Sequence, residues 1–207
     1  MDYAIIIVMG TSATLPTDGR TQRSERSRTA IVQAMLELIG EGSLSPTAQQ
    51  VAERADVGVR TVFRHFSDME TLFSTMNEQI KGEVESLFIE KVQTGPYEQR
   101  VDGLIERRME IFTSLAPYIR SSTLQRWRSA FLQAEHERTI RTLRVDLRRW
   151  LPEIESLPTE VGDALELIVS FEALNRLRVD QHLTLRRTVA VLRRTILDLT
   201  KTQTSTS

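Results

Sequence analysis

Residues 47–66 read TAQQVAERADVGVRTVFRHF, the most informative stretch of this 207-residue chain. It holds two short helical patterns with a break between them. The first, residues 46–54, has its small and apolar side chains on one face: Ala48, Val51 and Ala52. The second covers residues 59–65, where Val62 and Phe66 are spaced to lie on one side. Two short helices joined by a tight turn predict a helix-turn-helix.

The flanking segments also follow a helical period. Residues 27–41 carry apolar side chains at that spacing: Ile31, Met35, Leu38 and Ile39. Ser45 can cap the next helix, with Pro46 at its first position and Gln49 within capping-box range. A fourth helix is expected over residues 69–91. Beyond the first residues no segment shows the alternation of a strand, so the expected fold class is all-α.

The run over residues 47–66 resembles the helix-turn-helix of the TetR family of bacterial transcriptional regulators, and the likeness covers about residues 24–84. It is carried by residue types at the family's spacing: Ala52, Val57, Thr61, Phe63, His65 and Phe66. The resemblance implies an all-helical homodimer. In such a protein the N-terminal helix-turn-helix binds DNA, and a larger C-terminal domain senses a ligand and dimerises.

The resemblance places the front of the third helix in the major groove. Eight residues are then the expected DNA contacts: Thr47, Gly58, Val59, Arg60, Thr61, Phe63, Arg64 and His65. Arg60 is the leading base reader because a guanidinium can donate to both O6 and N7 of guanine, and Val59 suits a thymine methyl group. Thr47 and Thr61 are expected to bind phosphates, with His65 beside the backbone. A solvated surface arginine is the alternative for Arg60.

Three positions depart from the family's pattern. Phe63 stands where tyrosine is usual, which removes a hydroxyl donor, and a partly buried packing aromatic is its alternative interpretation. Met69 replaces a common lysine and Gly58 a frequent serine. DNA affinity can then depend more on a basic arm, for which a solvated charge run is the alternative. Its arginines are Arg20, Arg23, Arg26 and Arg28.

The sequence predicts four parts: a disordered arm (residues 1–22), a DNA-binding domain (23–84), a ligand-sensing and dimerisation domain (85–201) and a tail (202–207). The arm is rich in Thr, Ser, Gly and Pro and lacks an apolar period. Within the larger domain, helices are expected near residues 97–115, 118–125, 127–151, 159–181 and 185–201. Pro117, Pro152 and Pro158 mark breaks between them.

The larger domain also contains candidates for a ligand pocket. They are Met109, Phe112, Tyr118, Trp127, Phe131, Phe171 and Asn175. Aromatic and methionine side chains with a few polar groups are typical of small-molecule sites. Ordinary core packing is the alternative for each residue.

The last two expected helices suggest a dimer interface. The candidates are Val161, Leu165 and Ile168 on the first, and Leu185, Val189, Leu192 and Ile196 on the second. Apolar residues of the second follow a 4-3-4-3 spacing, as in helices packed at shallow angles. Two such helices from each chain would make a four-helix interface, and the resemblance puts the dimer there too. Packing within one chain is the alternative.

Composition narrows the remaining functions. The net charge of −1 provides no global basic field, so DNA binding must depend on a local group of arginines. The chain has no cysteine, which excludes disulfides and thiol chemistry and fits the cytoplasm. The apolar run at residues 5–9 is far shorter than the roughly 20 residues needed to span a bilayer. No catalytic or phosphate-binding motif is present, and neither His136 nor His182 has a metal-binding neighbourhood.

The expected function is therefore a DNA-binding transcriptional regulator and not an enzyme, with no cofactor and no bound metal. It is a ligand-responsive repressor that binds a palindromic operator as a homodimer. Its partners are double-stranded operator DNA, an unknown small-molecule effector and a second copy of itself, and no membrane. The alternative is a helical protein-interaction module without specific DNA binding, which a weak salt dependence of DNA binding would reveal.

Overall fold

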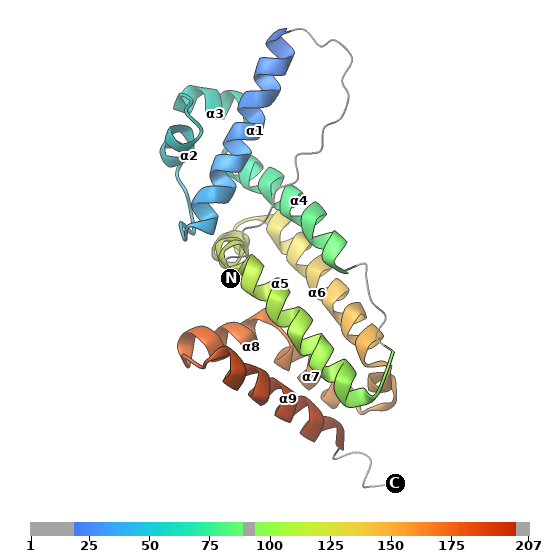
Figure 1. Cartoon of the computed structure of the whole chain (residues 1–207). Coiled ribbons are helices and arrows are strands. Elements are labelled where there is room, and N and C mark those ends of the chain that lie inside the picture. Colours follow the sequence, from blue (N-terminus) through green and yellow to red (C-terminus); the bar gives the residue numbers. More distant parts are fainter. Residues whose placement is uncertain (1–18, 89–93, 202–207) are drawn as a thin grey trace. The chain divides into compact units, whose positions relative to one another are not determined.

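The computed structural model describes residues 19–88 and 94–201, and every element in those ranges is helical (Figure 1). The α-helices are α1 (Gly19–Gly40), α2 (Ala48–Arg54), α3 (Val59–His65), α4 (Met69–Phe88), α5 (Tyr97–Arg126), α6 (Ala130–Trp150), α7 (Thr159–Ile168), α8 (Phe171–Asn175) and α9 (Leu185–Lys201). A 3-10 helix, η1 (Pro152–Ser156), precedes α7, and a π-helical turn, η2 (Arg176–Asp180), follows α8. The predicted all-α fold is confirmed.

The chain forms two compact units. The first combines α1 to α3, α4 as far as residue 84, and residues 116–133, which span the end of α5 and the start of α6. The second combines the described parts of residues 85–115 and 134–207. The sequence pattern predicted one boundary at residue 84, whereas residues 116–133 belong with the N-terminal helices.

Specific contacts attach residues 116–133 to the first unit. Ser121 Oγ donates to the carbonyl oxygen of Leu44 at 2.7 Å, and Ser122 Oγ donates to Asn77 Oδ1 at 3.2 Å. Leu132 is buried in the same core as the N-terminal helices. These contacts join residues far apart in sequence, so no local pattern could have predicted them.

The apolar faces of α1 to α4 meet in the core of the first unit. The large buried side chains are Ile31, Met35, Ile39, Val51, Val62, Phe66, Leu72, Phe73 and Met76. Each contributes about 1.5–3 kcal/mol by leaving water. The helix-turn-helix is therefore part of a unit with its own core, which fixes the orientation of α3.

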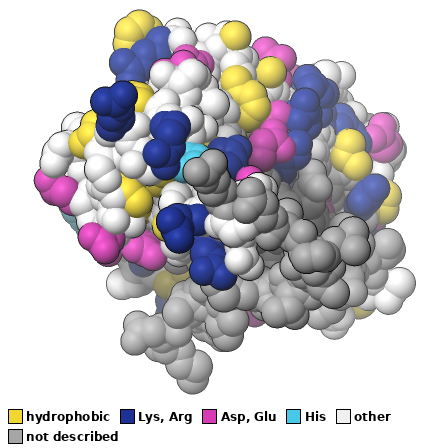
Figure 2. All heavy atoms as spheres, turned by 90° about the horizontal axis from the view of Figure 1, so that it is seen from above, with side chains coloured by type: hydrophobic (Ala, Val, Ile, Leu, Met, Phe, Trp, Pro, Cys, Tyr) yellow, Lys and Arg dark blue, Asp and Glu magenta, His cyan; other side chains and the backbone are white. Residues whose placement is uncertain are grey.

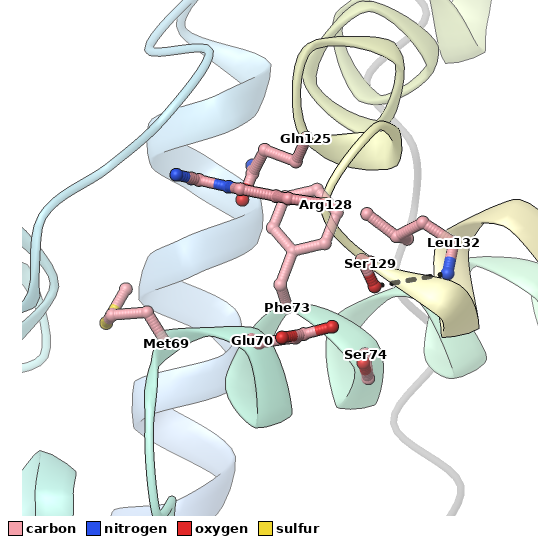
Figure 3. Close-up of a pocket in the computed structure, with 8 residues that line it drawn as sticks. All are labelled: Met69, Glu70, Phe73, Ser74, Gln125, Arg128, Ser129 and Leu132. Carbon is pink, nitrogen blue, oxygen red and sulfur yellow. Dashed lines mark hydrogen bonds between the residues drawn. The ribbon is translucent and has the colours of Figure 1, made fainter.

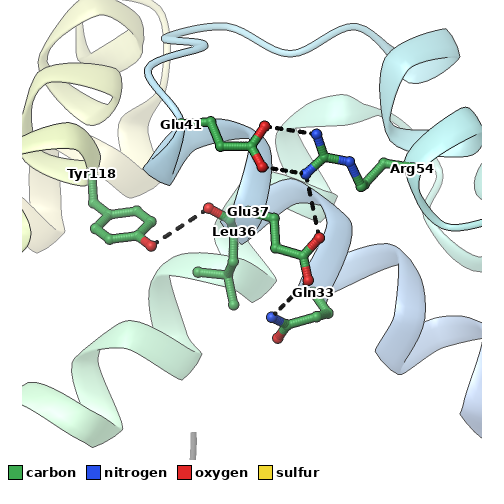
Figure 4. A network of polar contacts seen from close by, with 6 residues as sticks. All are labelled: Gln33, Leu36, Glu37, Glu41, Arg54 and Tyr118. Atoms are coloured by element: carbon green, nitrogen blue, oxygen red, sulfur yellow. Dashed lines mark hydrogen bonds and ion pairs between the residues drawn. The ribbon is translucent and has the colours of Figure 1, made fainter. Parts of the chain in front are cut away.

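A polar network joins α2 to α1 on the surface of this unit (Figure 4). The guanidinium of Arg54 donates to both carboxylate oxygens of Glu41, at 2.8 and 2.7 Å, and lies 3.4 Å from Glu37. Tyr118 donates to the carbonyl oxygen of Leu36 at 3.5 Å. Exposed ion pairs add little stability, but two parallel bonds constrain direction. The network therefore helps to set the angle between α1 and α2.

The second unit has a separate core, built on the first part of α5, α6, α7 and α9. Its most completely buried side chains include Leu104, Ile105, Leu147, Leu151, Leu165 and Ile196. Gly103 allows a close approach within it, because a Cβ atom there would lie 2.6 Å from the ring of Trp150. Any side chain at that position would push α5 away from Trp150.

Helix α5 continues through Pro117, where the sequence pattern predicted a break. Proline removes one backbone hydrogen bond and strains the preceding turn. The helix keeps its other bonds, and just beyond the proline Tyr118 and Ser121 are held by the core of the first unit. Packing therefore overrides the local rule.

The predicted helix over residues 159–181 is also wrong in one respect, because it is divided. Helix α7 ends at Ile168, and Ser170 caps α8 by accepting a hydrogen bond from the Ala173 N–H at 3.2 Å. A serine hydroxyl competes for backbone groups in this way and favours helix starts. The apolar period continues across the break and so conceals it.

The remaining boundaries differ by smaller amounts. Helix α1 begins at Gly19, so it includes residues 19–22 of the predicted arm, while residues 1–18 and the predicted tail at 202–207 lie outside the described residues. The N-cap of α2 is Thr47 and not Ser45. Thr47 Oγ1 accepts from the Gln50 N–H at 3.3 Å, and Gln50 Oε1 accepts from the Thr47 N–H at 2.8 Å. The capping box therefore uses Gln50 and not Gln49.

Candidate nucleic-acid interface

Helices α2 and α3 form a helix-turn-helix. The Val57 N–H donates to the carbonyl oxygen of Ala52 at 3.0 Å, and Asp56 adopts a left-handed backbone conformation with φ of 51°. Aspartate tolerates that conformation better than most residues. Ala52 is almost completely buried, so its small side chain lets the neighbouring helices pack closely.

The outward side of α3 carries the exposed side chains Arg60, Phe63 and Arg64. Val62 faces the core, so packing directs the two arginines to solvent. Figure 2 views the molecule from the side of α1 to α3, where basic side chains gather around a histidine. Helix α3 has no acidic residue. This arrangement suits contact with a polyanion, although the chain as a whole is slightly acidic.

Other residues predicted to contact DNA already make contacts within the chain. Thr47 Oγ1 also lies 3.0 Å from Gln50 Oε1, so its proton already has an acceptor and a phosphate contact would compete with the cap. Val59 packs against the core of the first unit, which leaves less of it for a thymine methyl group. Gly58 caps α3 through its backbone, since its carbonyl oxygen accepts from the Thr61 N–H at 2.7 Å. Thr61 itself is half-buried.

The basic residues near the start of α1 have different environments. Arg23 and Arg26 are exposed. The guanidinium carbon of Arg28 lies 4.5 Å from the centre of the Phe66 ring, a cation–π contact that also packs α1 against the end of α3. Arg28 therefore has a structural role in addition to its charge.

His65 is the last residue of α3, and its imidazole is partly buried. Its Nε2 is buried and has no hydrogen-bond partner. Burial lowers the pKa of His65, and the charges of Arg64 and Arg28 lower it further, while Glu25 acts in the opposite direction. A protonated His65 is thus disfavoured in the folded chain.

We expect acid to destabilise the first unit through this residue. Since the folded pKa of His65 is below its unfolded value of about 6.5, the unfolded chain takes up the proton first as the pH falls. The stability associated with neutral His65 is complete above the unfolded pKa and is lost as the pH falls below it. In urea unfolding at pH 7.5 and 5.5, His65→Gln should show a smaller acid loss than wild type. His182→Gln, at an exposed position in the second unit, is the control and should behave as wild type.

Only some of the predicted pocket residues in the second unit lie near one another. Met109 and Phe112 line a small cavity, and the Phe171 ring meets the Phe112 ring edge-on, with centroids 5.9 Å apart. Asn175 is the last residue of α8 and does not line this cavity. The cavity has a volume of about 10 Å³, enough for about one water molecule. A larger ligand would have to open it.

The other predicted pocket residues belong to the first unit. Tyr118 and Phe131 pack against its hydrophobic core, and Trp127 is 76% exposed. None of the three lines the small cavity. Helical spacing identified aromatic residues, but it could not tell which of the two cores each one joins.

A larger hollow, of about 200 Å³, lies in the first unit between the start of α4 and the turn that joins α5 to α6 (Figure 3). Its lining consists of Met69, Glu70, Phe73, Ser74, Gln125, Arg128, Ser129 and Leu132. No predicted pocket residue is among them. Met69, which stands where the family commonly has lysine, also packs partly against the core, so this departure concerns packing as well as charge.

One polar pair in the second unit was not found from the sequence. Arg108 on α5 and Asp146 on α6 are both buried, with Arg108 Nη2 and Asp146 Oδ2 3.0 Å apart. Arg108 lines the small cavity together with Met109 and Phe112. A signal was present, because an arginine at helical spacing from Ile105 and Phe112 lies on an apolar helix face.

Four of the seven predicted interface residues are buried within the chain itself: Val161, Leu165, Leu192 and Ile196. They pack α7 against α9, as the alternative interpretation of their spacing proposed. Ile168 and Val189 are half-buried, and Leu185 is exposed. The four buried residues have little surface left for a partner chain. The large hydrophobic side chains that are exposed on these two helices are Leu167 and Leu185.

In residues 19–88 and 94–201, no helix is long and apolar enough to cross a membrane. Within the same ranges, no three histidine, aspartate or glutamate side chains form a group that could hold a metal ion.

Comparison with known proteins identifies the class of this one. Residues 31–76 match the family model of the bacterial regulatory proteins of the tetR family. The crystal structure of a transcriptional regulator from Rhodococcus sp. Rha1 is similar, with a TM-score of 0.62 and 19% sequence identity over 86% of this chain and 96% of that one. No curated protein matches the chain. The helix-turn-helix of α2 and α3 lies within the matched residues. Residues 31–76 are therefore a DNA-binding domain of the TetR family, and the likeness to the solved structure shows the same helical fold.

Proposed function

We propose that this protein is a ligand-responsive repressor that acts in the cytoplasm and binds a palindromic operator as a homodimer. The observation that carries the proposal is the outward face of α3, where Arg60 and Arg64 are exposed on a helix oriented by its own core. Arg60 is the proposed base reader, and Thr61, Phe63, Arg64 and His65 are the proposed contacts around it. Binding depends on this local face because the whole chain has a net charge of −1.

The proposed dimer follows from the size of one DNA-binding head. A single small module buries only about 600–1,000 Å² on DNA, at the low end for specific complexes. Two heads held about 34 Å apart, or a multiple of that, can read two half-sites of a palindrome. We assign the dimer contact to the exposed sides of α7 and α9, around Leu167 and Leu185, with Ile168 and Val189 at its edge.

Ligand response is proposed as a coupling between the two units. An effector that binds the second unit lowers DNA affinity by about 1–3 kcal/mol if it favours a conformation with the wrong spacing between heads. The coupling is reciprocal, so operator DNA weakens effector binding by the same factor. Met109, Phe112 and Phe171 are the proposed surroundings of the effector.

Arg60→Ala tests the proposed reading of DNA. Sites selected from random DNA supply the operator, and a binding titration then compares it with variants changed at each base pair. The substitution is expected to weaken specific binding by about 1–3 kcal/mol and to relax the preference at one base position per half-site. Arg141→Ala is the control, because Arg141 is an exposed arginine on α6 in the second unit and its loss changes the net charge equally.

Two results would count against this assignment. An equal loss of affinity on every sequence would make Arg60 a phosphate contact. Wild-type DNA binding without a steep salt dependence would contradict the DNA-binding function itself and favour the protein-interaction alternative.

A further inference from the structure

Arg108 is a buried cation with only part of its hydrogen-bonding capacity used. It is 3% exposed, and its Nη2 lies 3.0 Å from Asp146 Oδ2 and donates to the carbonyl oxygen of Leu143 at 2.8 Å. Its Nε and Nη1 are buried and have no hydrogen-bond partner, and Asp146 Oδ2 also has none, so the contact between the two residues is an ion pair. Buried donors of a charged group are rarely left unpaired, because nothing replaces the water they lose. A missing acceptor is therefore indicated at this place.

The surroundings of Arg108 define what kind of acceptor fits. Arg108 lines the small cavity, whose other walls are largely apolar and include Phe112, Leu174 and Leu192. Its guanidinium carbon lies 5.9 Å from the centre of the Phe112 ring. Burial lowers the pKa of Arg108 to about 10, against the opposing effect of Asp146, so the group is still charged at neutral pH. The cavity thus presents a cation in an apolar setting.

The cavity can enlarge at one of its walls. It is closed to all but about 10 Å³, but Val169 and Ser170, which line it, form the junction between α7 and α8. A junction between helices moves at a smaller loss of backbone hydrogen bonds than a helix interior does. Met109, another lining residue, is unbranched and adapts to different shapes.

From this geometry we infer that the effector is a small apolar monocarboxylate, whose carboxylate accepts a hydrogen bond from an unpartnered N–H of Arg108 while its hydrocarbon part packs on Phe112 and Met109. The Leu143 carbonyl oxygen accepts from Nη2, and Asp146 forms an ion pair with the guanidinium, so Nε and Nη1 are the donors left for a ligand. A carboxylate oxygen accepts a stronger hydrogen bond from these donors than a neutral alcohol oxygen does, and an ammonium group has no acceptor to offer them. The inference rests on the proposed function in one respect, that the second unit senses a ligand.

Calorimetry on the full chain tests the ligand class with three matched probes: hexanoate, 1-hexanol and hexylammonium. They share one hydrocarbon chain and differ in the head group. Hexanoate is expected to bind at least about tenfold more tightly than 1-hexanol, since charge-assisted hydrogen bonds are the stronger kind. Hexylammonium is expected not to bind. Equal binding of hexanoate and 1-hexanol, or no binding of hexanoate, would overturn the inference.

Variants locate the site. The pair Arg108→Met with Asp146→Leu replaces both buried charges by apolar groups of similar size, an exchange that commonly preserves folding. This double variant should lose the preference for hexanoate and keep its helical circular dichroism. Arg108→Lys keeps the charge but changes the donors, and should weaken hexanoate about tenfold without affecting 1-hexanol.

Arg141→Ala is the matched control for the surface of α6. Arg141 lines an open hollow together with Arg138 and Arg149, and Asp146 of the buried pair lines the same hollow. It should leave hexanoate binding unchanged. Unchanged hexanoate affinity in Arg108→Lys, or loss of binding in Arg141→Ala, would place the carboxylate elsewhere and overturn the inference.

The inference and the proposed function can fail separately. Binding of hexanoate that requires Arg108 but leaves operator affinity unchanged would support the site and contradict ligand-responsive repression. Binding that also releases operator DNA would support both.

Discussion

Leu192→Glu is expected to unfold the second unit, lowering its free energy of unfolding by about 4 kcal/mol or more. Leu192 is 3% exposed on α9 and belongs to the same core as Leu165 and Ile196. The substitution removes a buried hydrocarbon side chain and introduces a carboxylate into an apolar setting. Domains are stable by only about 5–15 kcal/mol, so a loss of this size removes much of the native population.

Leu185→Glu provides a control with the same chemical change on the same helix, measured at a protein concentration low enough for the chain to be monomeric. Leu185 is 54% exposed in the single chain, so the new charge then stays in water and the stability should change by about 0.5 kcal/mol or less. Urea unfolding followed by circular dichroism compares the two variants. A Leu192→Glu chain that kept the wild-type midpoint while a dimer dissociated would show that this part of α9 faces a second chain.

The helices with the strongest apolar periods were predicted best from the sequence. Helix α9 spans Leu185–Lys201, as its spacing predicted, and α3 spans Val59–His65 as expected. In each case burial of one face agrees with the local preference of the residues. The all-α class and the helix-turn-helix follow from the same agreement.

The errors occur where a tertiary contact decides between local alternatives. The local rule predicts a break at Pro117, but this proline lies inside α5, where the residues that follow it are anchored in a core. The apolar spacing predicts one helix over residues 159–181, but Ser170 interrupts it and caps α8. Thr47 and Ser45 are both acceptable N-caps by type, and the structure uses Thr47. A periodic pattern contains no information on these choices.

The candidate site was predictable to different degrees in the two units. Val62 and Phe66 fix one face of α3 to the core, so the exposure of Arg60 and Arg64 follows from spacing alone. For the pocket, spacing gives burial but not the partner. It therefore grouped Phe112 with Phe131, which belongs to the other unit, and it passed over Arg108 because a buried arginine is an exception to the expected composition of a core.

The dimer interface shows the same ambiguity in sequence. Apolar spacing on α7 and α9 fits packing within a chain and packing between chains equally well. The burial of each residue distinguishes packing within the chain from packing between chains. Leu165 and Leu192 are buried inside the second unit, whereas Leu167 on α7 is 66% exposed in the single chain. A large exposed leucine next to two packed helices is the kind of residue a partner chain covers.

Leu167→Glu is accordingly expected to yield a folded monomer that no longer binds the full palindrome tightly. Its stability as a single chain should change little, because the side chain is exposed there, but in a twofold interface the two new carboxylates would meet and repel. Loss of the second head removes the gain from joint binding, about 10²–10⁴-fold in affinity, while affinity for an isolated half-site should not change.

Analytical ultracentrifugation gives the oligomeric state, and gel shifts on full and half operators give the two affinities. Leu192→Glu shows what simple unfolding looks like, since that variant should lose its helical circular dichroism. Half-site binding is therefore compared only for variants that keep the helical signal. A monomeric Leu167→Glu protein with wild-type affinity for the full palindrome would remove the dimer from the mechanism, and a variant that remained dimeric would assign the interface to another surface.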